Sequence, residues 1–368
     1  MRLRKVFLLL AVLLLMLPSC RRKAVENRPT IPYVRSILAD RTGREMSVLK
    51  SSPAPVVQAD ISYIGPSAAA DRFAELFSAY DRRDNVDGSF KQDGLPDFAG
   101  ETLVCISDDS LAIVSPDSSH VSFLRERVVR DALCALDTAL HISPYDLEGL
   151  GSKNRSKMMV LGTATLSRHG AFDVDTLFRS TGCGIPVFSP IEIAFDRVLS
   201  RGDRRLMNVG VIYDPRFSSE RDYQELFVKA CKVHGHSGSL CFPLPSGDRD
   251  SLVFRLLDAY VGSGHGGVLD AVIIDDMFVN TDEVKNELAR VVSVMNESSM
   301  TYGRLISKDF EVESSFELTA EAMYDYLRRY NLFTHDIAKP QLQTFRPVPR
   351  PEADDASVIL IPGSYVQN

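Results

Sequence analysis

The segment MMVLGTATLSRHGAFDVDTLFRSTGCGIPVFSP, residues 158–190, decides the fold class of this chain. It opens with the apolar run 158–161, which predicts a buried β-strand, and continues into a helical pattern at 174–180. A second strand pattern follows at 185–188. Apolar strands that alternate with helices are typical of a parallel sheet covered by helices on both faces.

The same alternation extends in both directions along the 368 residues. Further strands are predicted at 59–64, 102–106, 111–114, 209–213, 240–243, 271–274 and 304–307, and further helices at 68–80, 123–140, 193–199, 220–234, 251–261, 281–295 and 319–330. We therefore expect an α/β protein with two flavodoxin-like lobes, at 56–205 and 206–335, whose parallel sheets are flanked by helices. The remaining segment, 336–368, has a strand pattern at 358–361, which is a candidate for return to a sheet edge.

The N-terminal residues predict export from a bacterial cytoplasm. A basic start precedes the apolar run 6–17, which is shorter than the roughly 20 residues of a membrane-spanning helix but fits a signal peptide. The sequence LPSC at 17–20 then resembles a bacterial lipobox, which implies removal of residues 1–19 and a lipid on Cys20. An ordinary signal peptide that is cut near Ser19 is the alternative.

Residues 20–55 contain prolines and charges with little periodicity, so we expect a tether between the membrane and the folded body. Basic residues at 21–23 stand where some surface-exposed lipoproteins carry an acidic stretch. The expected location is therefore a membrane-anchored lipoprotein that faces the periplasm and not the cell surface.

Composition excludes some classes of function. The formal net charge is −7 and becomes roughly −10 without residues 1–19, so we expect no binding to nucleic acid. The cysteines other than Cys20 form no CxxC pattern and are expected in the core, and His234 and His236 fall in a turn. We expect no metal and no cofactor. The cysteines in question are Cys105, Cys134, Cys183, Cys231 and Cys241.

Hydroxyl and carboxyl side chains follow several of the predicted strands. In open parallel sheets, ligands bind at the carboxyl ends of the strands, so these side chains are candidates for a binding site. Each also has a simpler interpretation as the N-cap of the next helix. The candidate ligand-binding residues are Asp108, Thr163, Ser189, Tyr213, Asp214 and Asp275.

Three passages carry a family resemblance that covers roughly residues 100–310. They are the opening segment, NVGVIYDPRFSSERDYQELFVKACKVHG at 208–235 and LDAVIIDD at 269–276. Together they resemble the substrate-binding proteins of ABC transporters with the type I periplasmic-binding fold. The resemblance implies a small polar solute bound in an interlobe cleft and delivered to an ABC permease or sensed. On this basis we expect a binding protein and not an enzyme.

Two other functional classes remain open. The order of strands also resembles the aspartate/glutamate racemase group, whose members use one cysteine from each lobe as acid and base; here the matching positions hold Gly162-Thr163 and Asp275-Asp276. A hydrolase that uses cleft carboxylates such as Asp93, Asp97 and Asp108 is a related alternative. The third class is a structural or assembly lipoprotein with an inert body, in which bulky side chains would fill the cleft.

Overall fold

The computed structural model describes residues 28–364, except 115, 147–150, 202–205, 249–250, 265–266, 299–304, 335, 337 and 351–356. The expected signal peptide and Cys20 lie outside the described residues. Within the described ranges, no helix is both long enough and apolar enough to cross a membrane.

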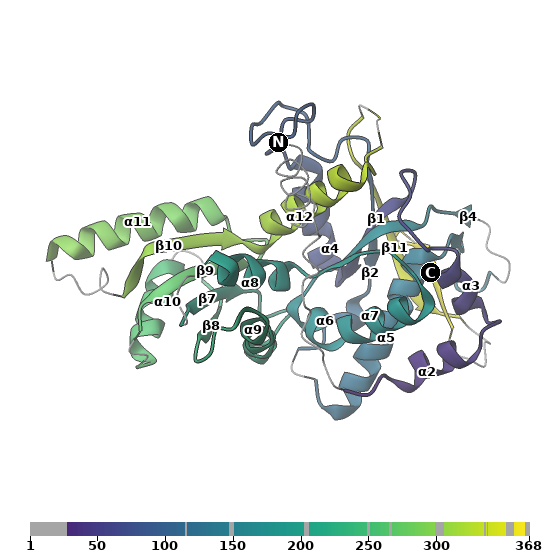
Figure 1. Ribbon diagram of the computed structural model, residues 1–368, viewed down its shortest axis with the longest axis horizontal. Helices are drawn as coiled ribbons and strands as arrows, with labels where there is room; N and C mark the ends of the chain where they lie inside the picture. Colours follow the sequence, from purple (N-terminus) through teal and green to yellow (C-terminus); the bar gives the residue numbers. More distant parts are fainter. Residues whose placement is uncertain are drawn as a thin grey trace, which may run out of the picture.

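Two main β-sheets lie at the centres of two lobes, which extend to opposite ends of the molecule (Figure 1). The sheet of the first lobe has the order β12-β11-β2-β1-β5-β6, and that of the second lobe has the order β10-β9-β7-β8. All pairs in both are parallel except β11 with β12. The strands are β1 (Asp60–Gly65), β2 (Thr102–Ser107), β5 (Ser156–Leu161), β6 (Val187–Phe188), β7 (Asn208–Tyr213), β8 (Leu240–Pro245), β9 (Leu269–Asp275), β10 (Ile306–Ser314), β11 (Gln341–Pro349) and β12 (Val358–Pro362), with a small separate pair of β3 (Ala139–Leu140) and β4 (Gly151–Ser152).

Helices cover both faces of these sheets, so the expected α/β class with parallel sheets flanked by helices is confirmed. A capping box of Ser219 and Asp222 starts α9, and Gly235 with φ of 76° ends it. The described helices are α2 (Pro32–Ala39), α3 (Arg44–Lys50), α4 (Ser67–Ala79), α5 (Ser118–Leu136), α6 (Ala164–His169), α7 (Ala171–Thr181), α8 (Pro190–Arg201), α9 (Glu220–His234), α10 (Leu252–Gly262), α11 (Thr281–Ser298) and α12 (Ser315–Tyr330).

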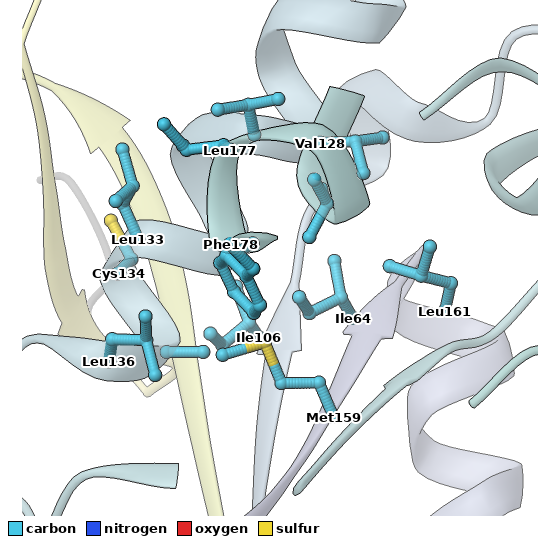
Figure 2. Packing of buried hydrophobic residues seen from close by; sticks show 14 of the residues in the cluster. Ile64, Ile106, Val128, Leu133, Cys134, Leu136, Met159, Leu161, Leu177 and Phe178 are labelled. Carbon is cyan, nitrogen blue, oxygen red and sulfur yellow. The ribbon is translucent and has the colours of Figure 1, made fainter. Parts of the chain in front are cut away.

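The central strands of the first sheet, β1, β2 and β5, are buried on both faces because neighbouring residues of each strand enter different cores. Figure 2 shows Ile64, Ile106 and Met159 packed with Phe178 of α7 and with α5. Ile61, Leu103 and Met158 belong instead to the cluster formed with α4 and α12. This double burial explains why the strands read as continuous apolar runs in the sequence.

Residues 28–55 differ from the expected tether, because they contain two ordered helices. Val34 of α2 and Leu49 of α3 are fully buried and belong to the same core as α5 and α7. Each helix has only two buried residues, so its apolar pattern is too short to stand out in the sequence.

The C-terminal part of the chain returns to the first lobe. Phe316 and Met323 of α12 belong to the same buried cluster as α4, and β11 pairs with β2 over residues 341–345. The second lobe is therefore an insertion between β6 and α12, which differs from the expected boundary at 335. A further difference is at 111–114, where no strand forms; instead, a 3-10 turn spans Asp109–Leu111 and is capped by Asp108.

Candidate functional site

A pocket lies between the two lobes, at the carboxyl ends of β5, β7 and β9. It contains about 310 Å³ of unoccupied space, part of which is open to solvent. Most of its lining follows a strand directly, as expected for parallel sheets. The lining residues are Ala69, Gly162, Thr163, Asp214, Phe217, Ser218, Tyr223, Asp275, Asp276, Met277 and Phe278.

Asp275 is the central titratable group of the pocket. It is the last residue of β9, and its Oδ2 accepts a hydrogen bond of 2.8 Å from the hydroxyl of Tyr223. Burial raises the pKa of Asp275 to about 6, although hydrogen bonds from Ser315 and Tyr223 counteract part of this rise and neighbouring Asp276 adds to it. A carboxyl group with this pKa can take up and release a proton near neutral pH.

Asp276 is a second carboxylate of the pocket, and only 3% of its surface is exposed. Its Oδ1 accepts a hydrogen bond of 2.8 Å from the backbone N–H of Phe278, and among the described residues no donor binds Oδ2. A buried carboxylate with one backbone donor keeps unused acceptor capacity.

Asp214, the third carboxylate, differs from the other two because an arginine neutralises it. Both Nε and Nη2 of Arg216 donate to its carboxylate oxygens, at distances of 2.6–3.0 Å. The guanidinium group of Arg216 also lies over the rings of Phe278 and Phe217, with centroid distances of 4.8 and 5.0 Å. Arg216 therefore packs against two aromatic residues of the lining, although it does not itself line the pocket.

Gly162 allows the close approach of a tyrosine on the first lobe's side of the pocket. The hydroxyl of Tyr63 donates to the carbonyl oxygen of Gly162 at 3.2 Å, and a Cβ atom at position 162 would lie 2.0 Å from that hydroxyl. Neighbouring Thr163 caps α6, since its side chain accepts a hydrogen bond from the backbone N–H of Leu166. Only glycine fits between β5 and the fully buried Tyr63.

Contacts across the interlobe boundary hold the pocket closed. Nε of Arg72 on α4 donates to the carbonyl oxygen of Met277 at 2.9 Å, and its guanidinium lies 5.9 Å from the ring centroid of Phe278. Beside the pocket, Asp222 of α9 accepts hydrogen bonds from Thr165 and Arg168, at 2.7 and 2.9 Å. The lobes are thus joined by polar contacts on two sides.

The structure brings together three of the six candidate residues identified from the sequence: Thr163, Asp214 and Asp275 all line the pocket. Ser189 is buried and its hydroxyl donates to the hydroxyl of Ser167 at 2.6 Å. Tyr213 is also buried, with its ring centroid 4.8 Å from that of Tyr223.

Asp108 lies away from the pocket, in a buried ion pair with Arg127 of α5. The sequence could not predict this pair, because the two residues belong to separate elements. The strand-end pattern does not include three aromatic residues that line the pocket, Phe217, Tyr223 and Phe278. Each of these aromatic residues lies within ten positions of the end of an apolar strand, which is the signal that could have identified them.

The five described cysteines do not line the pocket; all are buried and none forms a disulfide. Burial raises the pKa of Cys105 to about 12, so this thiol is poorly suited to act as a base. In the part of the chain that the structure describes, no group of three His, Cys, Asp or Glu side chains is arranged to hold a metal ion. The polar side chains that line the pocket are carboxylates and hydroxyls.

Sequence comparison finds no relative: no protein-family model and no curated protein matches the chain. Comparison with solved structures, in contrast, finds proteins of similar fold. A glutamate racemase from Bacillus anthracis matches with a TM-score of 0.50 and 12% identity, over 79% of this chain and 89% of that one. A glutamate racemase from Francisella tularensis in complex with D-glutamate matches with a TM-score of 0.46 and 12% identity, over 79% and 89%. A LacI family transcriptional regulator from Enterococcus faecium with bound ribose reaches a TM-score of 0.23 at 12% identity, over 77% and 95%.

These matches correct one expectation and select between two resemblances. The glutamate racemase from Bacillus anthracis is an enzyme and matches with a TM-score of 0.50, so the expectation that the protein is not an enzyme is contradicted at the level of the fold. The weaker of the two resemblances, to the racemase group, is the one that fits. At identities of 11–14% the match concerns the fold and not the substrate. This chain therefore has the two-lobed α/β fold of the glutamate racemases.

Proposed function

We propose that this protein is an enzyme that transfers protons by acid–base catalysis on a small polar molecule held between its lobes. One observation carries the proposal: Asp275 lines the interlobe pocket with a pKa raised to about 6 and with its carboxylate oriented by Tyr223. A general acid or base is most effective when its pKa is close to the working pH. A raised pKa in a pocket is also a frequent property of catalytic groups.

The chemistry differs from the two-thiol mechanism of the racemase group. At the two positions that match its cysteines, this chain has Gly162-Thr163 and Asp275-Asp276, and both pairs line the pocket. Thr163 is a poor base, and its side chain already caps α6. We therefore assign proton transfer to the second lobe alone, with Asp275 as the exchanging group.

Each neighbour of Asp275 has a defined role in this proposal. Ionised Asp275 accepts a proton from the substrate and later returns it. The hydrogen bonds from Tyr223 and Ser315 orient the carboxylate and limit the rise of its pKa. The contact of Arg72 with Met277 keeps the lobes closed, which limits the access of water to the reacting atoms.

Hydrogen exchange with solvent tests this function even while the substrate is unidentified. The purified full-length chain is incubated in D₂O with a panel of amino acids, hydroxy acids, amines and sugars, and loss of C–H signals is followed by proton NMR. We expect exchange for at least one class, and we expect Asp275→Asn to slow it by about 100-fold or more. Asp282→Asn is the matched control, because Asp282 is a well-exposed residue of α11 outside the pocket.

The second candidate function is binding of a polar solute without chemistry, which the same pocket and its polar lining favour. The experiment separates the two candidates. A compound that shifts the thermal unfolding temperature but never exchanges hydrogen with D₂O would contradict the enzymatic proposal and support simple binding.

We further propose that the enzyme acts at a membrane, through a lipid on Cys20. The support is the sequence LPSC at 17–20 after the apolar run 6–17. Metabolic labelling with an alkyne-bearing fatty acid should label the native chain and not Cys20→Ala. Cys183→Ala is the control, because it removes a buried cysteine of the folded body and should leave labelling unchanged.

A further inference from the structure

We propose that the substrate of this pocket carries an ammonium group, and that molecules with two carboxylates are excluded. This inference rests on the proposed function and names the substrate class for the same site. Its first basis is the charge of the lining, which includes three carboxylates and, among the described residues, no lysine, arginine or histidine. A pocket of this kind concentrates cations and repels anions.

The three carboxylates are not equally available to a ligand. Arg216 donates hydrogen bonds to both oxygens of Asp214. Asp275 accepts a hydrogen bond from Tyr223. Asp276 accepts only the backbone N–H of Phe278 among the described donors, although just 3% of its surface is exposed. A buried carboxylate is costly without charged or multiple donors, and an ammonium group supplies three.

The aromatic side chains of the pocket add an independent argument. Phe217, Tyr223 and Phe278 line it, and two guanidinium groups already lie over Phe278, at 4.8 and 5.9 Å from its ring centroid. The faces of aromatic rings attract cations, and this attraction grows where water is excluded. The pocket thus combines rings and carboxylates, the two side-chain types that recognise amines.

Size and charge together exclude dicarboxylic molecules. The pocket is small, because its roughly 310 Å³ of unoccupied space includes space that is open to solvent. The two guanidinium groups that contact the lining already have partners, Arg216 in Asp214 and Arg72 in the carbonyl oxygen of Met277. A second carboxylate on the ligand would have no cation to bind and would lie near Asp275 and Asp276.

Calorimetric titration of the full-length chain with matched probes tests the inference. Alaninamide carries an ammonium group, lactamide replaces it with a hydroxyl, and glutamate adds two carboxylates. We expect alaninamide to bind about tenfold more tightly than lactamide, and glutamate to bind more weakly than either. Asp276→Asn should reduce the preference for alaninamide to about twofold, whereas Asp282→Asn should leave it unchanged.

A second variant keeps the inference testable if Asp276→Asn does not fold. Phe278→Leu keeps the backbone N–H that Asp276 accepts and removes the ring, so we expect alaninamide to bind about threefold more weakly. Equal binding of alaninamide and lactamide, tighter binding of glutamate, or no binding of any amine at millimolar concentration overturns the inference. If the amine preference holds while no probe exchanges hydrogen with D₂O, the inference stands and the catalytic proposal fails.

Discussion

Carboxylates follow the strands β2 and β9 in the same sequence pattern, but their surroundings differ. After β9, Asp275 and Asp276 face a pocket and receive hydrogen bonds only from hydroxyls and a backbone N–H. After β2, Asp108 is bound by Arg127 of α5, which also donates to the carbonyl oxygen of Pro347 at 2.6 Å. Position at the end of a strand is therefore not enough to make a site; what matters is whether the helix behind the strand supplies a cation.

The cluster around Arg127 contains a second carboxyl group, that of Asp131. It is fully buried, and neither of its oxygens has a hydrogen-bond donor among the described residues. Burial raises the pKa of Asp131 well above its usual value, and neighbouring Asp108 raises it further. Burial and Asp108 therefore favour the neutral form of Asp131, whereas Arg127, whose Nε lies 3.7 Å from Oδ1 of Asp131, counteracts them. This cluster contains its own cation, in contrast to the lining of the pocket.

The largest effect on the free energy of unfolding is expected when Arg127 is removed from this cluster. Arg127→Met should lower the free energy of unfolding by about 3–5 kcal/mol, because it leaves Asp108 as a buried charge without a partner. Arg216→Met is the matched variant on the pocket side and should cost less, about 1–2 kcal/mol, because the guanidinium is 56% exposed and the buried Asp214 keeps the hydrogen bond from the backbone N–H of residue 216. Urea unfolding of both variants measures the difference. Equal losses would show that the two ion pairs are energetically alike.

A change of pH is expected to have an intermediate effect on the free energy of unfolding, through Asp275. The pKa of Asp275 in the folded chain is about 6, above its usual 3.8, so between pH 4 and pH 6 the unfolded chain releases this proton first. The contribution of Asp275 to stability is therefore fully present below about pH 4 and is lost as the pH rises towards 6, by roughly 2–3 kcal/mol. Catalysis has the opposite dependence, because the ionised base forms as the pH rises through 6.

Comparison of the native chain with Asp275→Asn isolates this contribution. Urea unfolding at several values between pH 4 and pH 7 should show the native chain losing stability relative to the variant as the pH rises. Asp131 is present in both proteins, so its contribution cancels in the difference. A difference that is independent of pH would contradict the raised pKa of Asp275.

The smallest effect on stability is expected at the contact that closes the pocket. Arg72→Ala removes the hydrogen bond to Met277 and the contact with the ring of Phe278. Because Arg72 is about one-third exposed, we expect a loss below about 1 kcal/mol. Backbone hydrogen exchange at residues 276–279 should nevertheless accelerate. Arg290→Ala, a surface change on α11, should alter neither quantity, and unchanged exchange in Arg72→Ala would remove this residue from pocket closure.

Much of the fold could be predicted from periodicity alone. The helix predicted at 220–234 has those bounds, and β7, β8 and β9 contain the strands predicted at 209–213, 240–243 and 271–274. β11 is not predicted because it contains Pro347 and Pro349, which are unusual inside a sheet. Both prolines lie beyond residues 341–345, the part that pairs with β2, so they remove no hydrogen bond from that pairing.

The candidate site could be predicted only in part. Thr163, Asp214 and Asp275 meet because parallel strands bring their carboxyl ends to one edge, which is a property of the chain's local pattern. The partners that decide their chemistry, such as Tyr223 for Asp275, come from helices whose rotation against the sheet is set by packing. The same limit explains the misplacement of Asp108, whose partner Arg127 comes from α5.

The insertion of the second lobe between β6 and α12 links the ionisation of Asp275 to the relative orientation of the two lobes. The chain returns to the first lobe at Ser315, the residue that donates a hydrogen bond to Asp275. Any rotation that separates the lobes must turn the backbone near this residue and so change a contact that stabilises the carboxylate. We therefore expect the protonation of Asp275 and the opening of the lobes to be thermodynamically coupled, so that each would report on the other.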